Sequence, residues 1–261
     1  MDKLNVIKIG GNIIDDESKL SSFLKEFASI EGRKILVHGG GKLATRIAGK
    51  LGITQKLLDG RRITDAETLK IVTMVYAGFI NKNIVAELQS HHCNAIGLCG
   101  ADGDLILAHK RNHPLIDYGF VGDVDAVNSD LLFVLLEKGI TIVVAPITHN
   151  QEGQLLNTNA DTIAQEIAKG MSTLYDVMLI YSFEKNGVLA DINDGTTIIP
   201  ELTPSYYKKL KDKKIINEGM LPKLDNAFTA LNSGVKKVVI GNAEMLAALI
   251  SGKNGTTIIN E

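Results

Sequence analysis

Two glycine turns are the most chemically suggestive feature of this 261-residue chain. Each turn follows an apolar run: Gly10-Gly11 comes after residues 3–9, and Gly39-Gly40-Gly41 comes after residues 33–38. Glycine lets backbone N–H groups approach an anion closely, and a helix that begins there directs its positive end toward the anion. The pair of turns therefore predicts a phosphate site.

Three charged residues could complement these turns. Lys8 lies two residues before Gly10, at the expected carboxyl edge of a strand, where α/β sheets bind ligands. Lys223 lies near a predicted helix start, and Asp161 lies in the first turn of another predicted helix, where its carboxylate could hold two ammonium groups in place. Taken singly, each also fits a plainer interpretation, as a solvated lysine or as an aspartate that serves a helix dipole.

Familiar phosphate motifs do not account for the turns. A Walker loop fails because Lys42 is followed by Leu43 rather than by Ser or Thr. The relaxed dinucleotide fingerprint is met by Gly39-x-Gly41-x-x-Ala44, but its ribose-binding acid would have to be Asp59, in a predicted turn or hairpin. We interpret that match as accidental, so a redox function is disfavoured.

Disulfide and metal chemistry are also disfavoured. Cys93 and Cys99 are the two cysteines, and a cytosolic chain would keep them reduced. Residues 91–93 read His-His-Cys, but neighbouring side chains on a helix diverge by about 100° and rarely converge on one ion. We predict no protein-bound metal.

Composition limits the partners. Apolar residues make up 45% and charged residues 22% of the chain, with a formal net charge of −2, so no basic excess points to nucleic acid or a membrane surface. The apolar stretches are far shorter than the ~20 residues of a membrane span, and the N-terminus has no signal-peptide organisation. These features predict a cytoplasmic protein.

Apolar runs alternate with helical patterns, which is typical of an α/β fold with a mostly parallel sheet covered on both faces. A restarting strand-like run near 170–174 suggests two lobes, 1–173 and 174–261. Helix signals are a capping box at residues 64–67 that opens a helix through the late seventies, N-caps at Asn128 and Asn159, and a stop at Gly170. The predicted strands are 4–9, 34–38, 94–98, 104–109, 119–126, 140–145, 175–181, 236–240 and 256–259.

An ordered set of motifs resembles acetylglutamate kinases of the amino-acid kinase family. The resemblance runs from about residue 4 to the C-terminus, and the motifs are specific when taken jointly. It implies a three-layer α/β sandwich with two lobes, one for the acyl-amino-acid substrate and dimerisation and one for the nucleotide. The motifs are Lys8-Ile-Gly-Gly11, His38-Gly-Gly-Gly41, Gly60-Arg-Arg62-Ile-Thr-Asp-Ala-Glu67, Gly119-Phe-Val-Gly-Asp123-Val, Asn157-Thr-Asn-Ala-Asp161 and Gly219-Met-Leu-Pro-Lys223.

The resemblance implies phosphorylation of the γ-carboxylate of N-acetyl-L-glutamate by ATP, the second step of arginine synthesis. That carboxylate is ionised at neutral pH, since the ordinary pKa of a glutamate side chain is about 4.3, so the reaction needs no general base. The protein has to align two anions that repel each other and compensate the charge on the transferred group.

The resemblance also implies a role for each motif residue. Lys8 and the N–H groups of the glycines would surround the phosphoryl group, Lys223 would offset charge on the departing ADP, and Asp161 would hold both lysines. Arg62 would bind the substrate's α-carboxylate bidentately, and Asn157 would fix its amide. Mg²⁺ should travel with ATP. The glycines concerned are Gly10, Gly11, Gly40 and Gly41; His38 is expected to be a neutral imidazole that braces its glycine turn.

Nucleotide binding is the departure from the family pattern. Relatives carry a Thr/Ser-Asp-Val-x-Gly-Val type segment after the strand that opens the second lobe, whereas this chain has Tyr181-Ser-Phe-Glu-Lys-Asn-Gly-Val188. Glu184 could replace the missing aspartate, or it could be a solvated turn residue together with Lys185. The predicted nucleotide contacts are Ser182, Lys185, Asn186, Gly187, Ile216 and Asn217.

The resemblance further suggests a homodimer that is insensitive to arginine, because arginine-inhibited relatives carry an additional N-terminal helix. The helix after Thr64 offers an apolar stripe that would face either a partner subunit or the subunit's own core. The stripe comprises Ile71, Val72, Met74, Val75 and Phe79.

Three alternatives remain open at this point. A sister kinase for another carboxylate or carbamate would keep both lysines and Asp161 without needing Arg62 and Asn157. N-succinyl-L-glutamate differs from the acetyl substrate in the acyl group, and the sequence does not reveal how roomy that pocket is. A non-catalytic metabolite sensor on the same fold would have no use for transition-state charge compensation.

Overall fold

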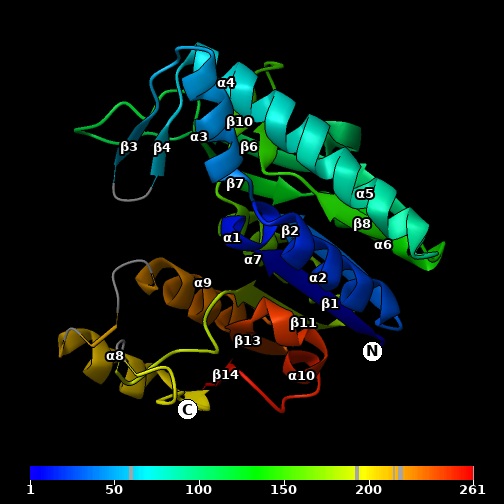
Figure 1. Ribbon diagram of the computed structural model, residues 1–261, viewed down its shortest axis with the longest axis vertical. Helices are drawn as coiled ribbons and strands as arrows, with labels where there is room; N and C mark the ends of the chain where they lie inside the picture. Colours follow the sequence, from blue (N-terminus) through cyan, green and yellow to red (C-terminus); the bar gives the residue numbers. More distant parts are fainter. Residues whose placement is uncertain (59–60, 192–193, 214, 217–219, 261) are drawn as a thin grey trace.

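A computed structural model describes residues 1–58, 61–191, 194–213, 215–216 and 220–260. Its main sheet has eight strands in the order β12-β14-β13-β11-β1-β2-β8-β5, and the neighbouring strands are parallel except for β13 and β14. The α/β class with a mostly parallel sheet is therefore confirmed. Blue-to-green N-terminal elements occupy the upper part of Figure 1, and yellow-to-red C-terminal elements occupy the lower part.

The predicted strands are confirmed within about three residues at each end. Five short strands, β3, β4, β9, β10 and β12, were not predicted as strands; of these β3 and β4 pair antiparallel, which agrees with the hairpin rather than the turn that the sequence left open there. The strands are β1 (Lys3–Ile9), β2 (Arg33–His38), β3 (Lys56–Leu58), β4 (Arg61–Ile63), β5 (Ala95–Leu98), β6 (Ile106–Lys110), β7 (Gly122–Val127), β8 (Thr141–Val144), β9 (Ile147–His149), β10 (Leu155–Asn157), β11 (Asp176–Phe183), β12 (Glu201–Leu202), β13 (Lys237–Asn242) and β14 (Thr256–Ile258).

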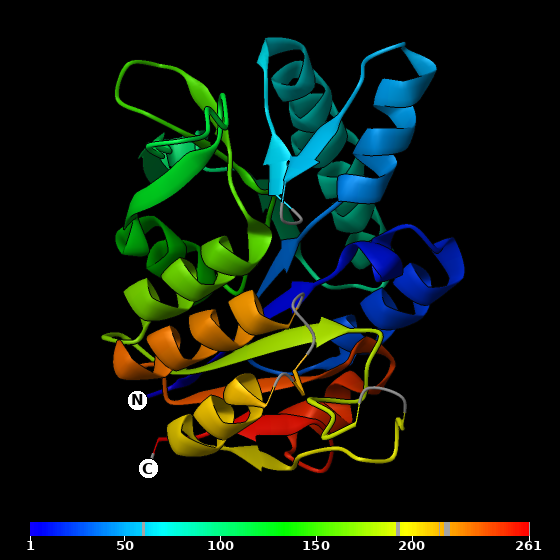
Figure 2. The same ribbon diagram turned by 90° about the vertical axis from the view of Figure 1, so that its left-hand side faces the viewer.

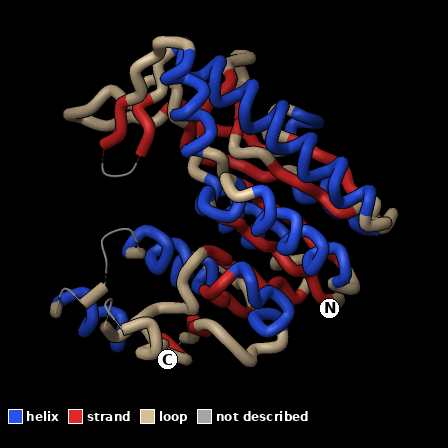
Figure 3. Tube along the Cα trace, in the orientation of Figure 1, coloured by secondary structure: helices blue, strands red, loops and turns tan. Residues whose placement is uncertain are grey.

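Helices cover the sheet on both sides (Figures 2 and 3). The α-helices are α1 (Gly11–Ile14), α2 (Glu17–Ser29), α3 (Gly41–Lys50), α4 (Ala66–Thr73), α5 (Asn81–Ser90), α6 (Ser129–Glu137), α7 (Ala160–Met171), α8 (Pro204–Asp212), α9 (Leu221–Asn232) and α10 (Leu246–Ile250). A π-helical segment, η1 (Met74–Ile80), joins α4 to α5, and 3-10 turns lie at η2 (Asp102–Asp104) and η3 (Ala243–Met245). No helix in the described ranges is long and apolar enough to cross a membrane.

Side-chain alternation along β1 divides the core into two layers. Leu4 and Val6 pack with α6, α7 and α9 on one face, whereas Ile7 and Ile9 pack with α2, α5 and α10 on the other. Both faces of a central parallel strand are buried, which explains why Leu4, Val6, Ile7 and Ile9 are all apolar. Lys8 is also buried, at 8% exposure, and its position at the end of this strand requires a compensating charge.

Two sequence-predicted helix boundaries are wrong. Asp65, not Thr64, is the N-cap of α4, because its carboxylate accepts the N–H of Thr68 at 2.8 Å. Thr64 instead forms a backbone bridge with Gly119, which has a φ of +69° and where an added Cβ would lie only 2.1 Å from the Thr64 carbonyl oxygen. Gly170 does not end α7, which continues to Met171. The predicted caps at Asn128 and Asn159 are confirmed.

The apolar stripe of α4 and η1 divides between two surroundings. Ile71, Val72 and Val75 are buried in the subunit's own core. Met74 and Phe79 are 58% and 64% exposed. The inward part of the stripe is therefore explained by the fold, and the outward part remains free to meet a partner.

The main sheet runs through both of the lobes expected from the sequence. Strands β1, β2, β5 and β8 come from residues before 174, and β11 to β14 come from residues after it. β1 pairs with β11 from Lys3 opposite Asp176 to Ile9 opposite Ser182. A division at residues 173–174 would therefore separate two halves of one continuous sheet.

Candidate active site

Lys8, Asp161 and Lys223 meet at the carboxyl end of β1. The Lys8 Nζ lies 2.6 Å from Oδ1 of Asp161, and the Lys223 ammonium donates to Oδ2 of the same carboxylate. Their side chains are 10%, 13% and 20% exposed, in the order Lys8, Asp161, Lys223. Residues more than 200 positions apart in the sequence thus form one cluster with two positive charges and one negative charge.

Local structure fixes the carboxylate between the lysines. Asp161 lies in the first turn of α7, where the side chain of Asn159 accepts the N–H groups of Asp161 and Thr162 at 2.8 and 3.2 Å. The hydroxyl of Tyr181 donates to the Asp161 carbonyl at 3.2 Å, and the hydroxyl of Ser182 donates to the Lys8 carbonyl at 3.0 Å. Neighbouring strand β11 therefore supports both the acid and one of its lysines.

Electrostatics keep the Asp161 carboxylate of this cluster ionised. Burial by itself would raise the pKa of Asp161, but the attraction of Lys8 and Lys223 outweighs burial and holds that pKa well below its usual range. Burial lowers the pKa of Lys8, an effect that the Asp161 carboxylate opposes and the Lys223 ammonium reinforces. Two ammonium groups around one carboxylate leave a net positive charge, which suits an anion that arrives between them.

The two glycine turns lie beside this cluster, at the ends of β1 and β2. Gly41 begins α3. Gly40 has a φ of +151°, and a Cβ added at this position would lie only 2.3 Å from the Cδ1 of Ile80. The N–H of Gly10 donates to the Ser182 carbonyl at 3.3 Å. For Gly11, Gly40 and Gly41 the described residues provide no backbone acceptor, so these N–H groups are the ones available to an anion.

His38 braces the second turn as a neutral imidazole. It is fully buried, and burial lowers its pKa to about 4. Its Nδ1 lies 2.8 Å from the Gly39 carbonyl and its Nε2 lies 3.3 Å from the Asn81 amide nitrogen. The first contact requires a proton on Nδ1 and the second an unprotonated Nε2, so the hydrogen bonds select one neutral tautomer.

Arg62 and Asn157 both line a pocket of about 200 Å³, which we call the acceptor pocket. Arg62 donates from Nη2 to the Gly41 carbonyl at 2.8 Å and to the Thr45 hydroxyl at 2.9 Å, and from Nη1 to Gln55. Asn157 donates to the Thr64 hydroxyl at 3.0 Å, which leaves its carboxamide oxygen to accept an N–H. The other lining residues are Gly39, Gly40, Gly41, Leu57, Tyr76, Arg111, Val121, Pro146, Thr158, Asn159 and Ala160.

Arg111 is a member of this pocket that sequence reasoning missed. It follows β6 and is held by Asp123, which accepts from Nε at 3.0 and 3.1 Å and from Nη2 at 2.5 Å. A lone arginine after a strand carries no sequence signal of its own. Asp123, however, belongs to the Gly119–Val124 motif, and that motif's acid could have prompted a search for its basic partner.

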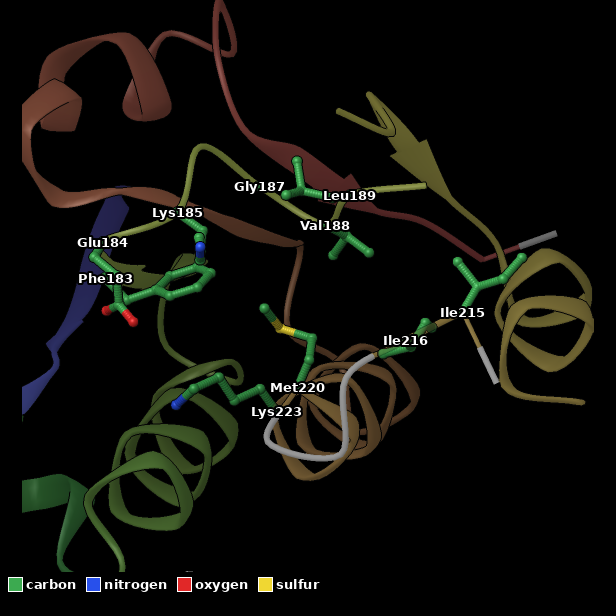
Figure 4. Close-up of a pocket in the computed structure, with 10 residues that line it drawn as sticks. All are labelled: Phe183, Glu184, Lys185, Gly187, Val188, Leu189, Ile215, Ile216, Met220 and Lys223. Carbon is green, nitrogen blue, oxygen red and sulfur yellow. The ribbon is translucent and has the colours of Figure 1, made fainter. Parts of the chain in front are cut away.

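A second pocket, of about 220 Å³, is lined in part by Lys223 (Figure 4). In Figure 4 the charged ends of Glu184, Lys185 and Lys223 gather toward one end together with the Phe183 ring, and the aliphatic side chains occupy the other. We call it the apolar pocket. Its lining residues are Phe183, Glu184, Lys185, Gly187, Val188, Leu189, Ile215, Ile216, Met220 and Lys223.

The structure brings three of the six predicted nucleotide contacts to this pocket, namely Lys185, Gly187 and Ile216. Ser182 is buried and its hydroxyl donates to the Lys8 carbonyl, while Asn186 accepts from the Asn242 side chain at 2.9 Å; neither is among the residues that line the pocket. Asn217 lies outside the described residues. Phe183, Val188 and Leu189 are lining residues that were not predicted, because the segment departs from the family pattern.

The cysteine and histidine run at residues 91–93 does not converge on one point. Cys93 is buried and donates to the Thr141 hydroxyl at 3.4 Å. Within the part of the chain that the structure describes, no three His, Cys, Asp or Glu side chains are grouped so as to hold a metal ion.

The sequence and the fold of this chain are both similar to those of known proteins. Residues 3–242 match the model of the amino acid kinase family. The acetylglutamate kinase of Cytophaga hutchinsonii is 58% identical over 96% of this chain and 96% of its own length. Two solved structures share the fold. Carbamate kinase from Giardia lamblia bound to AMP-PNP has a TM-score of 0.73 at 14% identity, covering 100% of this chain and 99% of its own. N-acetylglutamate synthase from Neisseria gonorrhoeae complexed with coenzyme A and N-acetyl-glutamate has a TM-score of 0.85 at 20% identity, covering 100% of this chain and 60% of its own.

Proposed function

The chain belongs to the amino acid kinase family, and we propose that it transfers the γ-phosphoryl group of ATP to the γ-carboxylate of N-acetyl-L-glutamate. The observation that supports this proposal is the Lys8–Asp161–Lys223 cluster, of which Lys223 lines the apolar pocket, while Asn159 and Ala160, which precede Asp161 in the chain, line the acceptor pocket. The name acetylglutamate kinase, borne by the Cytophaga hutchinsonii relative, supports the choice of substrate and a place in arginine biosynthesis. The enzyme is accordingly a phosphotransferase with a carboxyl group as acceptor.

The chemistry needs charge compensation rather than a base. An oxygen of the ionised γ-carboxylate attacks the γ-phosphorus, and the bond from that phosphorus to the bridging oxygen of ADP breaks. No proton is removed from the nucleophile. The products are an acyl phosphate and ADP, and the barrier falls through alignment and electrostatic stabilisation.

Each member of the charged cluster takes one part in this transfer. Lys8 and the N–H groups of Gly11, Gly40 and Gly41 would surround the phosphoryl group in flight, whereas Gly10 would shape the turn, since its own N–H is engaged. Lys223, which also lines the apolar pocket, would neutralise charge that grows on ADP. Asp161 would set the distance between the two ammonium groups.

The acceptor pocket suits the rest of the substrate. Arg62 would bind the α-carboxylate, exchanging one of its present contacts for the ligand, because the guanidinium fork matches a carboxylate bidentately. The free carboxamide oxygen of Asn157 would accept the N–H of the acylamide. Substrate is thereby fixed at two points, with the γ-carboxylate directed toward Lys8.

The apolar pocket suits a nucleotide. Its apolar walls would hold the base, and Lys185 would approach the phosphates from the charged end. Gly187 and Ile216 line the same walls, and Ser182, Asn186 and Asn217 stay predicted contacts. Mg²⁺ would arrive with ATP, since it binds phosphate oxygens and water readily and needs few protein ligands.

We further propose the division of labour expected from the sequence. Residues 1–173 would bind the acceptor and a second subunit, and residues 174–261 would bind the nucleotide. Exposed Met74 and Phe79 support a homodimer through η1. The cytoplasmic location and the insensitivity to arginine stay predictions.

The test is a coupled ADP-release assay with N-acetyl-L-glutamate, glutamate, aspartate and carbamate, in which hydroxylamine traps the acyl phosphate as a hydroxamate. We expect ADP and hydroxamate in equal amounts with the acylated glutamate. Binding without ADP release would indicate a metabolite sensor, and release with carbamate alone would indicate a sister kinase.

A further inference from the structure

The acceptor pocket contains one more cationic group than the proposed substrate requires. Two guanidinium groups, those of Arg62 and Arg111, line it, and the residues described as its lining include no acidic side chain. N-acetyl-L-glutamate has two carboxylates: Arg62 matches the α-carboxylate, and the γ-carboxylate reacts beside Lys8. Arg111 is left without an anionic group of the substrate to bind.

Backbone hydrogen bonds place Arg111 at the acylamide side of the pocket. The N–H of Arg111 donates to the Val121 carbonyl at 2.8 Å, Val121 forms a bridge with Asn157, and the N–H of Asn157 donates to the Phe120 carbonyl at 2.8 Å. Arg111 and Asn157 are therefore separated by one intervening chain segment. Arg62, by contrast, is bonded to Gly41 and Thr45 of α3.

Asp123 orients the guanidinium of Arg111 but does not occupy all of its N–H groups. Asp123 accepts from Nε and Nη2. Nη1 has no acceptor among the described residues, so that side of the planar group can still donate to an oxygen. The Arg111 side chain is 16% exposed, and its guanidinium lies 5.5 Å from the centre of the Tyr118 ring. A partly desolvated, held guanidinium binds a carboxylate more strongly than a mobile surface lysine does.

A purely structural role for the Arg111–Asp123 pair is the competing explanation. The pair joins the end of β6 to β7 and would stabilise that hairpin without any ligand. Such a role predicts no preference for charge in the acyl group. The two explanations therefore differ in a measurable quantity.

We propose that Arg111 recognises a carboxylate at the end of the acyl chain. This site would then take a dicarboxylic N-acyl-L-glutamate, such as N-succinyl-L-glutamate, in preference to uncharged acyl groups of the same size. This inference rests on the proposed kinase function. It makes Arg111 a specificity-determining residue for the same γ-carboxylate transfer.

The experiment compares kcat/KM for N-succinyl-L-glutamate with that for N-succinamoyl-L-glutamate, in which a carboxamide replaces the distal carboxylate at nearly constant size. A charge-assisted hydrogen bond contributes enough to predict a succinyl preference of about 10–100-fold. In Arg111→Met the preference should fall to near unity, and in Arg111→Lys it should be intermediate. Arg33→Met is the matched control, because Arg33 is also ion-paired, with Glu137 at 2.7 Å, but lies outside the pocket.

Equal kcat/KM for the two compounds in the wild-type enzyme would overturn the inference, and so would an equal loss of both in Arg111→Met. If that variant does not fold, the wild-type comparison of charged and neutral acyl groups decides by itself. Assays with N-acetyl-L-glutamate distinguish a failure of the proposed Arg111 role from a failure of the proposed kinase function. Turnover of the acetyl compound with none of the succinyl compound would refute the role of Arg111 alone, whereas no turnover of any acylated glutamate would refute the kinase function.

Discussion

Acidification should destabilise the folded protein through His38, because burial lowers the pKa of the folded imidazole to about 4 whereas the unfolded chain takes up the proton at mildly acidic pH. The imidazole is buried and neutral, donates from Nδ1 to Gly39 and accepts at Nε2 from Asn81. A second proton would convert Nε2 into a donor that faces the Asn81 amide group and would place a charge in the core. The turn that carries Gly40 and Gly41 would then lose its brace.

The size of the expected loss of folding stability follows from the shift in the pKa of His38. The ordinary value is 6.5 and the folded value is about 4, so below pH 6.5 the unfolded chain binds the proton that the folded chain refuses. Stability from this group is therefore complete above pH 6.5 and declines as the pH falls toward 4. At about 1.36 kcal/mol per pKa unit, the loss is about 2 kcal/mol at pH 5 and approaches about 3 kcal/mol below pH 4.

The assay is a urea titration at several pH values between 7.5 and 5 for the wild type and for His38→Gln, which has no group that titrates there. The difference in pH slope isolates His38 from the other five histidines. ¹⁵N imidazole shifts of labelled protein report the tautomer independently. Parallel pH slopes for the two proteins, or a His38 resonance that titrates near 6.5, would refute the reasoning.

Further predictions concern the site and the surface. Lys223→Ala should lower kcat by about 10²–10³-fold with little change in KM, measured by ADP release, and a normal kcat would remove its assigned role. Arg62→Ala should raise KM for the acceptor about 10–100-fold, and an unchanged KM would contradict carboxylate binding. Gly40→Ala should lower thermal stability by about 1–3 kcal/mol, because its Cβ would meet Ile80; a melting temperature equal to that of the wild type would show that the turn adapts. Phe79→Asp should convert a dimer into monomers in light scattering, whereas a monomeric wild type would refute the dimer proposal.

Secondary structure and the charged cluster were accessible from the sequence for different reasons. The strands follow from apolar runs that alternate with helical periods, since both faces of the sheet are buried. The grouping of Lys8, Asp161 and Lys223 was not derivable from periodicity, because it depends on long-range topology. It came from the order of the motifs.

The sequence-based predictions that were wrong or incomplete have physical causes. Thr64 and Asp65 are both good N-cap residues, and the bridge between Thr64 and Gly119 decides in favour of Asp65. Strands of two or three residues, such as β10 and β12, are too short to show an alternation. Arg111 was missed because its position in the acceptor pocket, held by Asp123 and Val121, depends on how the hairpin of β6 and β7 closes.

The continuous eight-stranded sheet bears on how the two substrates are brought together. A linker would allow the two halves of the enzyme to swing as separate bodies, but here seven residue pairs along β1 and β11 tie them edge to edge. A movement of the donor half toward the acceptor half as a whole would therefore change the twist between these two strands. Such a deformation is small in amplitude and moves Lys8. We therefore expect the two sites to approach each other and Lys8 to reach its catalytic position in a single motion.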